Sequence, residues 1–254
     1  MGSKKYNARV SLSELLVALL LGACSEKPEA MIISAKDYLA KNDRKAAVIQ
    51  IKNALQSNPN LPEARYLLGS ALLDSGDPVG AETELRKALD LKYSNDAVVP
   101  PLAQALLAQG EAKKMTEEFS RTGLTQPQAK ASLQMSMASA YAMQGKPDLA
   151  QTALNAALLA EPGYVPALIA QARQKADQGD LDGALAVADK VIVKSPQSHE
   201  AWKLKGDILL YGKNQVSDAL SAYRKAIEIK PDFLPGQAAV RPVRQQQGNL
   251  SVTG

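Results

Sequence analysis

Few side chains in this sequence could carry catalytic or metal chemistry. Cys24 is the only cysteine and His199 the only histidine among 254 residues. Zinc sites need several cysteine or histidine ligands, and a general base needs a partner that orients it. His199 stands in Ser198-His199-Glu200, the expected start of a helix, which favours a surface or capping role. The sequence therefore predicts no metal site, no cofactor and no enzymatic activity.

The glycines and the net charge argue against a phosphate-binding loop and a nucleic-acid surface, and the carboxylates have a structural explanation. Asp180 and Asp182 flank a turn, where capping of a helix explains them. The glycines fall singly at turns and form no phosphate-binding loop. The formal net charge of +4 is too small for a nucleic-acid surface, so we expect no nucleic-acid partner.

Cys24 is the one reactive side chain in an informative position. It follows a basic start and a short apolar run, formed by Lys4, Lys5 and Arg9 and then by 15–21. The run is shorter than the about 20 residues that cross a membrane as a helix, which favours a secretory signal. It ends in Leu21-Gly22-Ala23-Cys24, which resembles the lipobox of bacterial lipoproteins.

The lipobox resemblance implies a signal peptide at 1–23 and a mature chain that begins with a lipidated Cys24, tethered by 24–27. Such a protein has the membrane as a partner through its lipid anchor. We expect the periplasmic face of the cell envelope, and Ser25 after the cysteine favours the outer membrane. The alternative is a plain N-terminal helix that buries Cys24.

The rest of the chain is organised around helical hairpins. In 62–95, apolar and small residues recur twice at helical spacing, separated by Asp74-Ser75-Gly76-Asp77-Pro78. Gly76 suits the left-handed position that ends a helix, Asp77 can cap the next helix, and Pro78 suits its first turn. We therefore expect a helix, a tight turn and a second helix.

This hairpin recurs with a period of 34 or 35 residues. The small residue of the first helix recurs as Ala35, Gly69, Ala103, Ala138, Ala172 and Gly206. The equivalent position of the second helix holds Ala47, Ala81, Met115, Ala150, Ala184 and Ala219. A closing proline follows, with one exception, at Pro59, Tyr93, Pro127, Pro162, Pro196 and Pro231. Small side chains let paired helices approach closely, so the columns predict tight hairpins.

A helix–turn–helix unit of this length with these columns resembles the tetratricopeptide repeat. The resemblance implies an all-α, right-handed superhelical solenoid. We expect six repeats within 28–233, at 28–61, 62–95, 96–130, 131–164, 165–198 and 199–233. Repeat three should be looser because Met115 stands at a small position, and repeat six should carry one extra residue in its turn near Gly212. We expect 234–254 to be a truncated seventh repeat or a frayed tail. The chain is then either the N-terminal part of a longer array or the product of a frame that ends prematurely.

A non-catalytic repeat protein acts through its shape, and stacked first helices offer a concave groove for a protein or peptide segment. Counting along the first helices predicts these groove residues: Tyr66, Ser70, Leu73, Gln104, Leu107, Met135, Ser139, Met143, Ile169, Arg173, Lys203 and Tyr211. The set mixes apolar and polar side chains, as adaptable binding surfaces do. We expect Trp202 to be buried at a packing position.

A narrower resemblance rests on LGACSEKPEA and LLGSALLDSGDPVGAETELRKALDL. These stretches are similar to the TPR-repeat lipoprotein of PEP-CTERM/exosortase systems. The resemblance implies a scaffold in the Gram-negative envelope, linked to PEP-CTERM protein sorting and to the machinery that makes and exports exopolysaccharide. Two alternatives stay open: a lipoprotein of pilus or outer-membrane assembly, and a module that contacts the polysaccharide directly.

Overall fold

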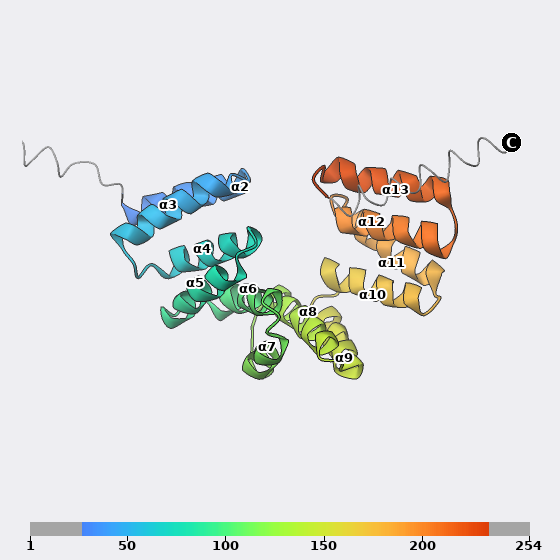
Figure 1. Cartoon of the computed structure of the whole chain (residues 1–254), viewed down its shortest axis with the longest axis horizontal. Coiled ribbons are helices and arrows are strands. Elements are labelled where there is room, and N and C mark those ends of the chain that lie inside the picture. Colours follow the sequence, from blue (N-terminus) through green and yellow to red (C-terminus); the bar gives the residue numbers. More distant parts are fainter. Residues whose placement is uncertain (1–26, 234–254) are drawn as a thin grey trace, which may run out of the picture. The chain divides into compact units, whose positions relative to one another are not determined.

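The computed structural model describes residues 27–233, and these residues form helices that pack in adjacent pairs (Figure 1). Within this range there are twelve α-helices, α2–α13, one π-helical turn and no strand. The predicted all-α architecture of helical hairpins is therefore confirmed. None of the helices in 27–233 is long and apolar enough to cross a membrane. The expectations for the signal peptide, the lipobox, Cys24 and the C-terminal tail lie outside the described residues.

The chain divides into two compact units at Ser94. The first unit contains two hairpins, formed by α2 (Pro28–Ala40) with α3 (Arg44–Ser57) and by α4 (Pro62–Asp74) with α5 (Pro78–Asp90). Its core gathers side chains from α2, α3 and α4, among them Ile32, Ile51 and Leu68. Each hairpin falls within one of the expected repeats.

The second unit contains four hairpins. The first two are formed by α6 (Asn95–Ala108) with α7 (Ala112–Phe119), and by α8 (Pro127–Met143) with α9 (Pro147–Ala160). The third is formed by α10 (Val165–Asp177) with α11 (Leu181–Lys194). The fourth consists of α12 (His199–Asp207), the π-helical turn η1 (Ile208–Gly212) and α13 (Val216–Ile229).

The turns inside the hairpins share one backbone conformation. The second residue after the end of each first helix has a φ between 56° and 84°, and these residues are Asn42, Gly76, Gly110, Gly145, Gly179 and Asn214. This left-handed position favours glycine and asparagine, which explains their recurrence. Asp77 then caps α5 by accepting a hydrogen bond from the Gly80 N–H at 2.9 Å. The predicted roles of Gly76 and Asp77 are confirmed.

The columns of small residues lie where the two helices of each hairpin touch. A Cβ added at Gly69 would stand 2.6 Å from Leu85 Cγ, and one at Gly206 would stand 2.5 Å from Tyr223 Cε1. Most of the other positions in the columns are buried as well. Ala150 is the exception, because it is half-buried and lines a cavity.

Repeat three accommodates its large residue with a short second helix. Met115 is fully buried, and α7 has only 8 residues, whereas α5 has 13 and α9 has 14. Polar contacts hold the loop that follows this short helix. The Asp96 carboxylate accepts hydrogen bonds from the backbone N–H groups of Thr125, at 2.7 Å, and Gln126, at 3.1 Å, and also from the Thr125 hydroxyl. The loop that leads into α8 is thereby fixed to α6.

The extra residue of repeat six does not simply lengthen the turn, which corrects the expectation placed near Gly212. It is absorbed by the π-helical turn Ile208–Gly212 at the end of α12. A π-helical turn holds one more residue than an α-helical turn, so the insertion widens the helix. The left-handed residue that ends the segment is then Asn214, with a φ of 56°. Tyr211 and Gly212 are carried on this widened turn.

Candidate functional site

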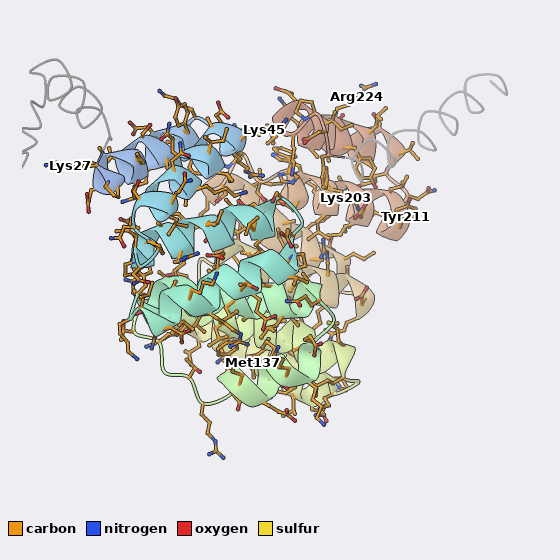
Figure 2. The ribbon with its side chains drawn as sticks, turned by 60° about the vertical axis from the view of Figure 1, so that its left-hand side comes forward. Lys27, Lys45, Met137, Lys203, Tyr211 and Arg224 are labelled. Carbon is orange, nitrogen blue, oxygen red and sulfur yellow. The ribbon has the colours of Figure 1, made fainter. Side chains whose placement is uncertain are left out.

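Most of the side chains predicted for the groove are accessible. Tyr211 is 75% exposed and Met143 58% exposed. The other exposed members are Gln104, Ser139 and Arg173, and the half-buried ones are Tyr66, Ser70, Leu73, Leu107, Met135 and Lys203. Tyr211 projects from η1 and Lys203 from α12 (Figure 2).

Ile169 was expected in the groove, but it is only 7% exposed. Its side chain belongs to a hydrophobic core with Leu168, Ala172 and Ala184. Burial of a branched apolar side chain is worth roughly 1.5–3 kcal/mol, which favours the core over an accessible position. Ile169 therefore offers little surface to a partner.

In the first unit, the predicted residue Tyr66 has an aromatic partner that the sequence did not reveal. Its ring stacks on Tyr93, with 5.2 Å between the ring centroids and 25° between the planes. Tyr93 stands in the column of closing prolines, so the exception in that column has a structural reason. Burial raises the pKa of the Tyr93 hydroxyl. The Oγ atom of Ser70 is buried on the same helix and has no hydrogen-bond partner among the described residues.

In the second unit, two of the predicted residues line a cavity of about 640 Å³. Met135 and Ser139 reach it from α8, together with Ala138 and Ala142. Helix α9 contributes the half-buried Ala150, and α10 contributes its remaining wall. The lining is mainly apolar with a few polar groups, as ligand-binding clefts usually are.

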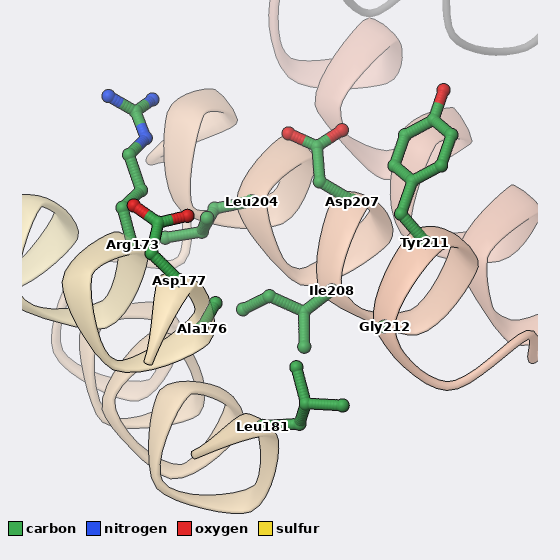
Figure 3. Close-up of a pocket in the computed structure, with 9 residues that line it drawn as sticks. All are labelled: Arg173, Ala176, Asp177, Leu181, Leu204, Asp207, Ile208, Tyr211 and Gly212. Carbon is green, nitrogen blue, oxygen red and sulfur yellow. The ribbon is translucent and has the colours of Figure 1, made fainter. Parts of the chain in front are cut away.

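Two more predicted residues, Arg173 and Tyr211, line a second cavity of about 410 Å³ between α10 and α12–η1. Leu181, Leu204 and Ile208 supply its apolar part (Figure 3). Asp177 lines both this cavity and the one of about 640 Å³. The two cavities therefore follow one another along the first helices α8, α10 and α12. We call this surface the first-helix strip.

The charges of the first-helix strip are partly paired. Asp207 accepts a hydrogen bond from Lys203 Nζ at 2.5 Å and another from the Tyr223 hydroxyl at 3.0 Å. Burial, reinforced by the Asp207 charge, raises the pKa of Tyr223, so its hydroxyl stays protonated as a donor. Arg173 and Asp177 are exposed, and neither side chain has a charged or hydrogen-bonded partner within 27–233. These two side chains are available to a ligand.

The remaining candidates for chemistry have structural roles. His199 is half-buried, meets the Phe233 ring edge-on at 4.5 Å between centroids, and lies 3.0 Å from Glu200. Ser198 caps α12 by accepting a hydrogen bond from the Ala201 N–H. Asp180 caps α11 in the same way, through the Gly183 N–H at 2.9 Å. Within the described range, no three His, Cys, Asp or Glu side chains are placed to hold a metal ion.

Trp202 was expected to be buried, and this was wrong, because its side chain is half-buried. Its indole N–H donates to the carbonyl oxygen of Pro196 at 3.0 Å. The ring lines a cleft formed by α11, α12 and α13, which no predicted groove residue touches. Sequence reasoning missed this cleft. One signal in the sequence could have indicated it: the charged Lys205 lies on the same helix as Trp202 and lines the same cleft, whereas a fully packed helix face would be apolar.

Comparisons with known proteins agree with this architecture. The family model described as tetratricopeptide repeat matches residues 34–96 and 169–232, together half of the chain. A curated relative, cellulose synthase operon protein C of Xanthomonas axonopodis pv. citri (strain 306), is 30% identical over 167 residues. That match covers 60% of this chain but only 11% of the relative, so the chain spans about a tenth of its length.

Two solved structures are similar in fold. The crystal structure of the APC/C hetero-tetramer Cut9-Hcn1 has a TM-score of 0.63 and 13% identity, with 91% of this chain and 45% of that chain covered. The crystal structure of PilW, a type IV pilus biogenesis factor, has a TM-score of 0.62 and 19% identity, with 85% of this chain and 100% of that chain covered. The hairpins, the small-residue columns and the match over half of the sequence lead to one assignment: this chain belongs to the tetratricopeptide repeat family.

Proposed function

We propose that this tetratricopeptide repeat scaffold binds a protein segment along the first-helix strip of its second unit. The observation that carries the proposal is the succession of two cavities, of about 640 and 410 Å³, that share Asp177. Each cavity offers apolar surface to an anchoring side chain, and binding energy in such interfaces concentrates at a few buried anchors. The expected ligand is therefore a segment with two apolar side chains, spaced so that each enters one of the two cavities.

The polar groups of the first-helix strip would fix the orientation of that segment. Arg173 and Asp177 carry opposite charges and have no charged partner within 27–233. Asp177 lines both cavities, and Arg173 lines the one of about 410 Å³. Exposed charges of this kind contribute more to specificity and to the association rate than to affinity. Met135 in the first cavity adds a flexible side chain that can adapt to different anchors.

We further propose that the protein is lipid-anchored through Cys24 in the Gram-negative envelope and serves exopolysaccharide production or PEP-CTERM protein sorting. The support is the lipobox-like Leu21-Gly22-Ala23-Cys24, the family resemblance of the sequence, and a relative named as a cellulose synthase operon protein. The fold of PilW keeps pilus assembly as the alternative.

Site-directed photo-crosslinking in a Gram-negative host tests the binding surface. A crosslinking amino acid at Ser139, Arg173 or Tyr211 should capture the same envelope protein. Lys190 is an exposed residue of α11 that lines neither cavity, and it serves as the matched control. Equal capture from Lys190 and Arg173 would contradict the proposed site, and identification of the captured protein would separate the polysaccharide system from the pilus system.

The anchor has its own experiment. Intact mass and membrane fractionation should show a chain that begins at Cys24 and carries acyl groups, and Cys24→Ala should abolish both the acyl mass and the membrane association. An unprocessed soluble chain would refute the anchor. It would leave the groove proposal standing, because residues 27–233 alone form the first-helix strip.

A further inference from the structure

The cleft beside Trp202 is a second concave site, separate from the first-helix strip. It measures about 410 Å³, within the range of about 300–1,000 Å³ typical of small-molecule sites. Helices α11, α12 and α13 and the turn η1 supply its walls, and none of its lining residues lines the two cavities of the strip. Any ligand bound here would thus leave the strip free.

The indole of Trp202 is held in a fixed orientation. Its N–H donates to the Pro196 carbonyl at 3.0 Å, which secures one edge of the ring. The equivalent residue of repeat two makes the same contact, because Arg65 donates to the Pro59 carbonyl at 3.0 and 2.8 Å. This hydrogen bond fastens the loop between repeats. In repeat six it also fixes an aromatic ring at the cleft, and a ring that is already ordered loses little entropy on binding.

The floor and the rim of the cleft differ in chemistry. We call its apolar lining residues the floor: these are Leu185, Leu209 and Ala222, of which the last two are buried, together with the half-buried Trp202. We call its more exposed polar lining residues the rim: two carboxylates, two ammonium groups and one hydroxyl, from Asp189, Asp218, Lys205, Lys225 and Ser221. The ligand must therefore combine an apolar face with polar groups at its edge.

The charges of the rim cancel. Lys205 donates to Asp189 at 2.7 Å and lies 5.9 Å from the centre of the Trp202 ring, and Lys225 pairs with Glu228 at 2.7 Å. Asp218 has no side-chain partner within 27–233, so its carboxylate is free to accept hydrogen bonds. The Ser221 hydroxyl donates to the Ser217 carbonyl and retains lone pairs as an acceptor. A neutral ligand that donates hydrogen bonds fits this rim better than a charged one.

We propose that the Trp202 cleft binds a hexose unit of a neutral polysaccharide. A pyranose ring has an apolar face of C–H groups, which can lie against the indole and the aliphatic floor. Its edge carries hydroxyl groups, which can donate to Asp218, Asp189 and Ser221. The unpaired carboxylate of Asp218 favours a hydroxyl donor, while the cancelled charge of the rim gives a polyanion no net attraction. This inference does not rest on the proposed protein-binding function, because the two surfaces share no lining residue.

The single tryptophan of the chain makes the test direct, since all indole fluorescence comes from Trp202. The full chain is titrated with three neutral hexasaccharides, namely cellohexaose, maltohexaose and hexa-N-acetylchitohexaose. At least one should change the fluorescence in a saturable way at millimolar concentration, and oligogalacturonate should not. If none of the three does so, the inference is overturned.

Variants then locate the site. Asp218→Ala should weaken binding about three- to tenfold, as expected from the loss of one or two hydrogen bonds. Asp148→Ala is the matched control, because Asp148 is also an exposed carboxylate in the first turn of a second helix and does not line the cleft. It should leave the affinity unchanged.

Calorimetry compares the saccharide affinity of Trp202→Phe with that of Trp202→Ala. The phenylalanine variant lacks the fluorescent reporter but keeps an aromatic face. The alanine variant should bind at least about tenfold more weakly than the phenylalanine variant, a difference of about 1.4 kcal/mol. Circular dichroism must show that both variants are folded. Equal affinity of the two folded variants, or an Asp218→Ala variant that binds like the wild type, would place the saccharide elsewhere and refute the inference.

Discussion

Replacing one alanine by leucine at two equivalent positions gives a sharp test of the packing. Ala81 and Ala150 occupy the same place in their second helices, and repeat logic alone predicts that leucine overpacks both hairpins. The structure separates them. Ala81 is fully buried, whereas Ala150 is half-buried and lines the cavity of about 640 Å³.

The three added carbon atoms therefore have different surroundings. At Ala81 they must displace packed side chains, which typically costs about 1–3 kcal/mol. At Ala150 they can extend into the cavity, so the free energy of unfolding should change by about 0.5 kcal/mol or less, as at ordinary surface positions. For a chain of this size, 1 kcal/mol corresponds to about 2–4 °C in the melting temperature.

Urea and thermal unfolding followed by circular dichroism measure the difference. Ala81→Leu should lower the midpoint clearly, and Ala150→Leu should barely change it. The same Ala150→Leu variant should weaken crosslinking from Ser139, because the new side chain fills the cavity. Equal destabilisation by both substitutions would refute the reasoning, since it would mean that Ala150 is as tightly packed as Ala81.

Three further predictions concern single contacts. The hydrogen bonds from Thr125 hold the pKa of Asp96 below its usual value. Their stabilising effect should therefore be present above the unfolded-state pKa and be lost as the pH falls through the folded-state pKa. Asp96→Asn should remove this part of the acid dependence of the urea midpoint. Gly206→Ala should destabilise the protein by about 1–2 kcal/mol, because the new Cβ would meet the ring of the fully buried Tyr223. This cost should exceed the gain from the better helix propensity of alanine. A rise in melting temperature would contradict that contact. Trp202→Ala should cost less than the about 3–5 kcal/mol of a fully buried aromatic residue, which the urea midpoint will report.

The hairpins could be predicted from the sequence because their signals are local. A left-handed residue followed by a capping aspartate, as in Gly76 and Asp77, fixes where one helix ends and the next begins. Glycine at 69 and at 206 marks close contact between helices, and the structure shows that contact against Leu85 and Tyr223. These features depend on a few neighbouring residues, so a single sequence is sufficient to identify them.

The candidate site depends on packing between repeats, and the sequence predicted it less well. Ile169 was assigned to the groove by helical counting, but it is buried in the core that α10 shares with α11 and α12. The extra residue of repeat six could equally have lengthened a turn or widened a helix, because both solutions have the same number of residues. The widened helix brings Tyr211 and Gly212 to the wall of the second cavity.

Helix α12 explains why both candidate surfaces of the second unit meet at repeat six. Gly206 on one side of the helix lets Tyr223 pack closely. A second side carries Leu204, Asp207 and, on η1, Tyr211, which face the first-helix strip. A third carries Trp202 and Lys205, which line the Trp202 cleft. The helix and η1 also pack on α10 and α11 through the buried Ala201, Leu204 and Ile208. The close contact at Gly206 fixes α12 against α13, and α13 supplies Asp218 and Ser221 to the cleft beside Trp202.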